Sequence, residues 1–246
     1  MSYSPDTQYN LYDLIKKADG GDLDAMETAV SLIAAEGYTE DDPDGEITER
    51  RFSYLRQLAD SGRTSAYIML GDAYLQGEGI TKDAVEAINW YKKAAENGVM
   101  FGNECIGMIY YEGNGVPTDY QKAYEYFTKD NGRKSFCTIY SLGEMYRCGL
   151  YVMKDQVKAY DYYSGIVNSE EPYPELDDYY WRACYRVGIA LHYGYGVKKD
   201  LSTAVEVFAK AKMLYESRGE STVQTGITKE EFYQEWMLLN QDAGKY

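Results

Sequence analysis

The chain has few of the residues on which catalysis and metal binding depend. Among its 246 residues there is one histidine, His192, and there are four cysteines, Cys105, Cys137, Cys148 and Cys184, with no C-x-x-C pair. A Ser-His-Asp or Cys-His site would have to use His192, and the sequence shows no nucleophile, base and orienting group around it. A zinc site needs several histidine or thiolate ligands, and a calcium loop of the D-x-D-x-D-G type is missing. We therefore expect no enzyme, no metal and no cofactor, with the four thiols reduced.

Positive charge is also scarce. Lysine and arginine number 25 against 40 aspartate and glutamate residues, so the formal net charge is −15. Such a surface repels phosphate, and neither nucleic acid nor a membrane is expected as a partner. No apolar run approaches the roughly 20 residues that span a bilayer, and Met1–Asp6 does not resemble the start of a secretory signal, so we expect a cytoplasmic protein. Tyrosine, by contrast, is abundant at 28 residues, which indicates a folded chain rather than a disordered acidic one.

What the chain does contain is an internal repeat. The motif L-G-x2-Y-x2-G-x-G begins at Leu70, and its first glycine, Gly71, returns as Gly107, Gly143 and Gly188. The spacings are 107 − 71 = 36, 143 − 107 = 36 and 188 − 143 = 45. The second half of each unit carries an aspartate followed four residues later by alanine, at Asp83, Asp119, Asp155 and Asp200. Self-similarity at such a period is typical of a repeat protein.

The first half of the unit predicts a helix with one closely packed face. Ala66, Leu70, Gly71 and Tyr74 occur at i, i+4, i+5 and i+8, which lie on one side of a helix. Because Gly71 lacks a Cβ, a neighbouring helix can approach its backbone. That approach must outweigh the roughly 1 kcal/mol that glycine costs inside a helix.

The second half predicts a turn and a capped helix. Gly77 and Gly79 supply the left-handed backbone that ends the first helix. Asp83 is placed to cap the second helix, and Glu86 follows three residues later, as in a capping box. Each unit is therefore predicted to be a helix hairpin, and the chain to be all-α.

The complete pattern, A-x3-L-G-x2-Y-x2-G-x-G-V-x2-D-x3-A-x2-W-Y-x-K-A-A-x2-G, is matched nearly throughout by Ala66–Gly98. It resembles the Sel1-like repeat, a relative of the tetratricopeptide repeat, and the resemblance covers roughly Asp22 to Gly219. The resemblance implies a right-handed superhelical solenoid of helix-turn-helix repeats. The third full copy has Tyr151 where the pattern has glycine, and Asp130–Gly132 shortens the end of the copy before it. These departures predict a different turn or curvature there.

We expect three parts in the chain. Residues 1–21 form an N-terminal helix or cap, residues 22–219 form about five repeats of which the first is degenerate, and residues 220–246 form a C-terminal capping helix and tail. The first helix of the degenerate copy is expected from Asp22 to Glu36, and the capping helix from Lys229 to Asn240. Two insertions interrupt the period, an acidic one over residues 37–47 and one near residues 169–178 that holds the 45 − 36 = 9 extra residues. We interpret both as surface variation, with a functional loop as the alternative.

The resemblance also implies that the first helices line a concave surface. At 100° per residue, the positions of these helices that point away from the core differ from repeat to repeat, as a specific binding groove requires. We expect a protein or peptide to contact Glu104, Tyr111, Tyr140, Glu144, Arg147, Arg182, Tyr185, Arg186 and His192. The alternative is that several of these tyrosines pack between neighbouring first helices. This face is acidic toward its N-terminal half and basic and aromatic toward its C-terminal half, so a bipolar peptide is a conceivable ligand.

The function implied by the resemblance is that of an adaptor or scaffold for other proteins. One alternative is an inhibitor or immunity-type protein that covers a basic enzyme with its acidic surface. Another is a hydrolase or carbohydrate-binding protein that uses the aromatic residues of the groove. Secreted relatives linked to cell-wall or β-lactam chemistry carry regular cysteine pairs, which this chain lacks.

Overall fold

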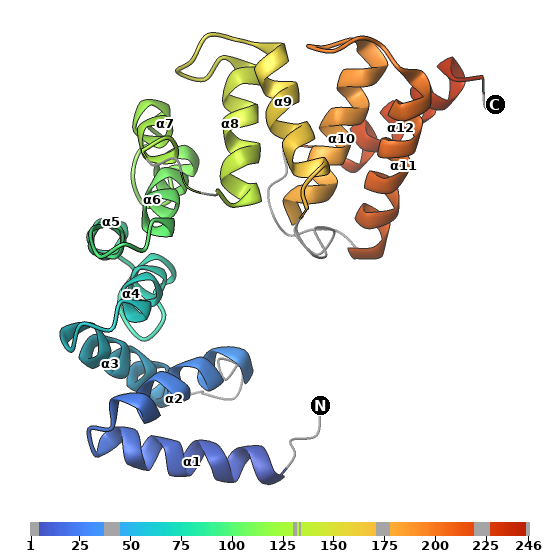
Figure 1. Cartoon of the computed structure of the whole chain (residues 1–246). Helices are drawn as coiled ribbons and strands as arrows, with labels where there is room; N and C mark the ends of the chain where they lie inside the picture. Colours follow the sequence, from blue (N-terminus) through green and yellow to red (C-terminus); the bar gives the residue numbers. More distant parts are fainter. Residues whose placement is uncertain are drawn as a thin grey trace. The chain divides into compact units, whose positions relative to one another are not determined.

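The computed structural model describes residues 5–36, 45–129, 132, 134–170, 178–218 and 227–244. These residues form 12 helices and no strand, which confirms the all-α class. The chain divides into two compact units, Met1–Gly132 and Arg133–Tyr246, termed unit 1 and unit 2 (Figure 1). Most of the two predicted insertions, at residues 37–44 and 171–177, lies outside the described residues, as do Asp130 and Asn131.

In unit 1, each helix packs against the next one along the chain. The helices are α1 (Pro5–Asp19), α2 (Leu23–Glu36), α3 (Glu46–Asp60), α4 (Ser65–Gln76), α5 (Ala84–Glu96), α6 (Phe101–Glu112) and α7 (Tyr120–Phe127). The motif hairpins of this unit are α4 with α5 and α6 with α7. The helix expected from Asp22 to Glu36 corresponds to α2, which packs against α3 in the same way.

Unit 2 contains two more motif hairpins and a final helix. Its helices are α8 (Phe136–Cys148), α9 (Gln156–Val167), α10 (Asp178–Tyr193), α11 (Leu201–Arg218) and α12 (Lys229–Asp242). The first helix of the second hairpin, α10, packs against α8, α9 and α11, and α12 packs against α11 (Figure 1). This stacking of successive hairpins is the solenoid arrangement that the repeat predicted.

Each motif hairpin turns through the same backbone hydrogen bonds. The first helix ends at a left-handed glycine such as Gly77, whose N–H donates to the Ala73 carbonyl at 2.8 Å. The second helix begins at an aspartate such as Asp83, whose Oδ1 accepts from the Val85 and Glu86 N–H groups at 2.9 and 3.1 Å. The predicted cap is therefore confirmed.

The predicted capping box at Asp83 and Glu86 is wrong. Its reciprocal half requires the Asp83 N–H to donate to the Glu86 side chain, but this N–H donates to the Tyr74 carbonyl at 2.8 Å. The equivalent bond occurs in the next two repeats, at 2.9 Å from Asp119 to Tyr110 and from Asp155 to Tyr146. The donor is thus used to tie the second helix back to the end of the first.

The repeat glycine receives an aromatic ring from the second helix of its own hairpin. A Cβ on Gly143 would lie 2.5 Å from Cε1 of Tyr163, and one on Gly71 would collide with the ring of Tyr91. Such contacts are far closer than two carbon atoms tolerate. The expected close approach at this glycine is therefore made by an aromatic ring of the second helix.

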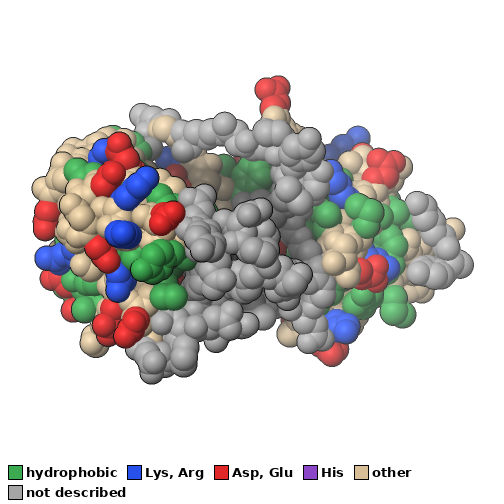
Figure 2. Space-filling view, turned by 90° about the horizontal axis from the view of Figure 1, so that it is seen from below, with side chains coloured by type: hydrophobic (Ala, Val, Ile, Leu, Met, Phe, Trp, Pro, Cys, Tyr) green, Lys and Arg blue, Asp and Glu red, His purple; other side chains and the backbone are tan. Residues whose placement is uncertain are grey.

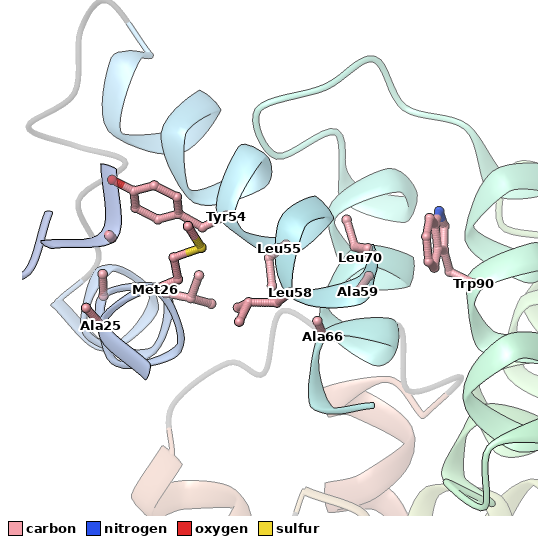
Figure 3. Packing of buried hydrophobic residues seen from close by; sticks show 12 residues of the cluster. Ala25, Met26, Tyr54, Leu55, Leu58, Ala59, Ala66, Leu70 and Trp90 are labelled. Carbon is pink, nitrogen blue, oxygen red and sulfur yellow. The ribbon is translucent and has the colours of Figure 1, made fainter. Parts of the chain in front are cut away.

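In unit 1, buried apolar side chains of successive helices pack together in a cluster that runs from α1 to α5. Figure 3 shows Met26 of α2 against Leu55 and Leu58 of α3, with Leu70 of α4 and Trp90 of α5 further along. All of these side chains are buried. The cluster thus joins helices of successive hairpins, which is why single hairpins of this kind need the array for stability.

Tyr151 is the only non-glycine residue with a positive φ among the described residues, at 64°. The equivalent glycines in the other repeats have nearly the same value, with 68° at Gly79, 75° at Gly115 and 73° at Gly196. The altered turn expected at Tyr151 is therefore wrong: the turn keeps its shape. The cost is a left-handed conformation at a residue with a Cβ, about 1 kcal/mol.

Charged residues of both signs lie on the surface of the described residues. On the face shown in Figure 2, acidic and basic side chains are interspersed over the described residues. Several of them pair, as Arg63 does with Asp24 at 2.6 Å. Within the described part of the chain, none of the helices combines the length and apolarity needed to cross a membrane.

Candidate binding site in unit 2

Glu144, on α8, is the centre of a charged cluster that joins three helices. Its Oε2 accepts from Nη2 of Arg147, one turn later on the same helix, at 2.6 Å. Its Oε1 accepts from Nε of Arg186 on α10 at 2.8 Å and from the hydroxyl of Tyr163 on α9 at 2.7 Å. Arg186 also donates from Nη2 to Oε2 at 3.1 Å, so its guanidinium grips the carboxylate with two bonds.

The cluster holds both arginines and the glutamate in their charged forms. Burial opposes ionisation of Glu144, but the hydrogen bond from Arg147 and the charges of Arg186 and Arg147 outweigh it, so the pKa of Glu144 lies below its ordinary value. Burial also opposes the charge on Arg186, yet Tyr140 and Glu144 raise the pKa of that guanidinium. Two arginines and one carboxylate leave a net charge of 2 − 1 = +1.

A pocket of about 420 Å³ opens on this cluster. It is formed by the end of α8, the first turns of α9, the middle of α10 and the turn that follows α10. The charged residues of its lining are all basic: Arg147, Lys154 and Arg186. Glu144 is not part of the lining, because its carboxylate is turned to the guanidinium groups that it binds. The pocket therefore presents positive charge on a protein that is acidic as a whole.

Aromatic residues complete the wall, and large side chains in or next to the lining sequence are exposed. Tyr160, Tyr163 and Tyr195 line the pocket. Tyr195 is 51% exposed, and Met153 and Val157, which adjoin lining residues in the chain, are 89% and 55% exposed. Large apolar side chains left in solvent beside a pocket are typical of a binding surface.

The turn after α10 is held against α9 by close packing. A Cβ on Gly196 would collide with the Gln156 carbonyl. Gln156 in turn donates from Nε2 to the Arg147 carbonyl at 3.3 Å. These contacts fix Tyr195 and the start of α9 relative to the arginines, so the pocket is built from packed elements.

Of the nine residues predicted to contact a partner, four come together here. Tyr140, Glu144, Arg147 and Arg186 form the cluster, but only the two arginines line the pocket. Tyr140 is buried, its hydroxyl accepts from Nε of Arg186 at 3.3 Å, and burial raises its pKa to about 12. It acts as a support for Arg186.

Three further predicted residues on α10 lie in the interior of unit 2. Arg182 is 3% exposed and packs its guanidinium over the ring of Tyr179, 4.8 Å from the ring centroid. Tyr185 stacks on Phe232 of α12 at 5.2 Å, and Nε2 of His192 lies 2.9 Å from Oδ2 of Asp242 at the end of α12. Side chains covered in this way contribute to helix packing.

The remaining two predicted residues belong to unit 1. Glu104 is buried on α6. Tyr111, also on α6, makes aromatic contacts with Tyr120 and Phe127, at 5.6 and 6.2 Å between ring centroids. Neither takes part in the pocket of unit 2.

A helical wheel gives the direction of a side chain but not what lies there. The positions one residue after and three residues before the repeat glycine of α8, Glu144 and Tyr140, point at the next first helix, α10. Pocket residues from α9 and the turns, such as Lys154, Tyr160 and Tyr195, were missed because only the first helices were considered. A lysine directly before the capping aspartate, as at Lys154, recurs at Lys82 and Lys199, so the sequence offered no signal that singled it out.

Within the described residues, no group of three histidine, cysteine, aspartate or glutamate side chains is placed to hold a metal ion. His192 has Asp242 as its polar neighbour on a helix end. The site is thus a basic, tyrosine-lined pocket between stacked helix hairpins.

This fold and this kind of site define a helical repeat protein. The family model of the Sel1 repeat matches residues 64–99, 106–129, 139–164 and 181–215, which fall on the four motif hairpins. The chain belongs to the Sel1 repeat family. Sel1 repeat proteins are generally scaffolds for protein interactions and are typically non-catalytic. A search of curated proteins finds no match to the chain.

Solved structures show the same architecture. The chain is 26% identical to c5321, a protective antigen of uropathogenic Escherichia coli strains with an SLR fold, over 82% of this chain, with a TM-score of 0.65. It spans only 40% of the length of c5321. A Sel1 repeat protein from Oxalobacter formigenes is similar over 90% of this chain and 88% of its own, with 22% identity and a TM-score of 0.64.

Proposed function

We propose that this chain is a scaffold that binds a segment of a partner protein at the pocket of unit 2 and the exposed residues around it. The observation that carries the proposal is the exposure of Tyr195, which lines the pocket, and of Met153 and Val157, which adjoin lining residues in the chain. A peptide that buries these three side chains gains apolar contact area without ordering the scaffold, because the helices and turns that hold them are already packed.

The proposal moves the binding surface away from several residues predicted on α10. Tyr185 and His192 are covered by α12, whereas Arg186, Ile189 and Ala190 of the same helix line the pocket. Variants at Tyr140 or Tyr185 would disturb the core of unit 2 and are poor probes of binding.

Site-specific photocrosslinking tests the proposal. The photoreactive residue benzoylphenylalanine replaces Tyr195 or Met153 at the pocket, and Tyr12 on α1, which is 71% exposed, as the control position. After irradiation in cells of the source organism, mass spectrometry identifies crosslinked proteins. We expect the same protein to crosslink at positions 195 and 153 and to be absent at position 12.

The absence of any protein crosslinked at positions 195 and 153, or the same proteins at all three positions, would contradict the proposal. A basic enzyme captured at the pocket, together with loss of its activity on binding, would instead favour the inhibitor.

A further inference from the structure

Resting on the proposed function, we infer that the pocket of unit 2 takes a carboxylate side chain of the bound segment, so that the scaffold selects an acidic peptide. The inference starts from charge. The chain as a whole carries −15, yet Arg147, Lys154 and Arg186 are the charged residues of the lining. With Glu144 beside them, the local sum is 3 − 1 = +2.

Arg147 and Arg186 each keep hydrogen-bond donors that Glu144 does not use. Glu144 binds Nε and Nη2 of both Arg147 and Arg186. Their Nη1 groups make no hydrogen bond to the described residues, and neither does Nζ of Lys154. A guanidinium has five N–H donors in a fixed plane, and that geometry matches a carboxylate.

Glu144 positions these donors. By holding one edge of each guanidinium, it fixes the plane of both groups and directs the opposite edge away from itself. Only part of the positive charge is neutralised by this arrangement, because one carboxylate faces two arginines. The hydrogen bond from the Tyr163 hydroxyl to Glu144 and the one from Arg186 to the Tyr140 hydroxyl hold the cluster in place before any ligand binds.

The rest of the lining suits a peptide side chain. Ala159, Ile189 and Ala190 provide an apolar wall for the methylene groups of glutamate. Tyr160 and Tyr195 offer rings beside the backbone or beside apolar neighbours of the acidic residue. A phosphate shares the anionic chemistry but makes no use of the apolar wall, so we assign the pocket to a carboxylate.

The test uses three fluorescein-labelled heptapeptide pools with leucine, tyrosine and methionine at the outer positions. The central residue is glutamate in one pool, glutamine in the second and phosphoserine in the third, and binding to the full chain is followed by fluorescence anisotropy. We expect the glutamate pool to bind about tenfold more tightly than the glutamine pool. Its affinity falls as salt is raised, and sodium phosphate competes only weakly.

Two matched variants locate the effect. Lys154→Glu reverses an exposed charge of the lining, and we expect it to weaken binding of the glutamate pool by about tenfold or more and to weaken the glutamine pool by less. Lys199→Glu is the control, because Lys199 holds the same place before the capping aspartate of the next hairpin and does not line the pocket. Circular dichroism verifies that both variants are folded.

Equal binding of the glutamate and glutamine pools, or no binding of either, overturns the carboxylate inference. Tighter binding of phosphoserine or strong competition by phosphate reassigns the pocket to phosphate and also overturns it. The scaffold proposal is tested separately by the crosslinks at Tyr195 and Met153. A neutral peptide bound at the same place would therefore contradict only the carboxylate inference.

Discussion

The Tyr91 hydroxyl on α5 donates a hydrogen bond of 2.6 Å to Oδ1 of Asp72 on α4. Asp72 directly follows the repeat glycine, and the pair returns two repeats later as Tyr163 and Glu144, at 2.7 Å. In the other two motif hairpins the ring belongs to phenylalanine, and the residue after the glycine is apolar, at Met108 and Ile189. An acidic residue therefore follows the repeat glycine where the covering ring is a tyrosine. The reason is that the ring places its para position, which carries the hydroxyl, against the residue after the glycine.

This relationship predicts a compensating pair of substitutions. Tyr91→Phe removes the donor to Asp72, whose pKa burial already raises, and should destabilise the protein by about 1–2 kcal/mol in urea denaturation. Adding Asp72→Met reproduces the Phe127 and Met108 combination of the next repeat and should recover most of that loss. A double variant that is at least as unstable as Tyr91→Phe alone would contradict the pairing.

Glu144→Gln should destabilise the protein at neutral pH by about 3 kcal/mol. This is the low end of the range for a broken buried ion pair, since Arg147 keeps 35% of its side chain in solvent. The pKa of Glu144 is lowered by folding, so the unfolded chain binds the proton more tightly. Its contribution is complete above the ordinary pKa near 4.5 and is lost as the pH falls through the lower folded value.

The measurement is the difference in unfolding free energy between Glu144→Gln and the native chain from pH 7 to pH 3. We expect this difference to shrink as the pH drops below about 4.5. A difference that stays constant down to pH 3 would show that ionisation of Glu144 does not stabilise the cluster.

Two glycines of unit 2 should respond to alanine in opposite directions. Gly143→Ala forces a Cβ to within 2.5 Å of the Tyr163 ring, and we expect a loss of about 1–3 kcal/mol from overpacking. Gly165→Ala, on the neighbouring helix α9, meets nothing within 4 Å and should stabilise the chain by up to about 1 kcal/mol through helix propensity. Thermal unfolding followed by circular dichroism compares the unfolding temperatures of the two variants. Equal changes in unfolding temperature would argue against the contact between the Tyr163 ring and Gly143.

The turn glycine and its tyrosine replacement make a similar pair. Tyr151→Gly should raise the unfolding free energy by up to about 1 kcal/mol, because glycine adopts a φ of 64° without strain. Gly196→Ala should lower it by more than that, since its Cβ would collide with the Gln156 carbonyl. Urea titrations of both variants provide the check. A loss of stability in Tyr151→Gly would mean that the tyrosine ring makes contacts worth more than the strain.

The sequence pattern was a correct guide where one residue acts on its own hairpin. Gly77 ends a helix and Asp83 begins one for reasons contained in a few neighbouring residues, and both roles are confirmed. It failed for Glu86, because the Asp83 N–H is taken by the Tyr74 carbonyl across the hairpin. It also failed for the shape of the Tyr151 turn, because the two helices that the turn joins dictate its backbone more strongly than the residue at its apex.

The helix hairpins and their stacking follow from the sequence alone, because the glycines, capping aspartates and rings recur at positions that act locally or within one repeat. Which outward residues remain accessible depends on how distant elements pack against them. Whether Tyr185 is free or covered depends on α12, and the pocket exists because Arg147, Lys154 and Arg186 approach one another from three elements. Periodicity specifies the direction of a side chain around its own helix. The neighbour that it meets is set by the packing of elements at irregular distances along the chain.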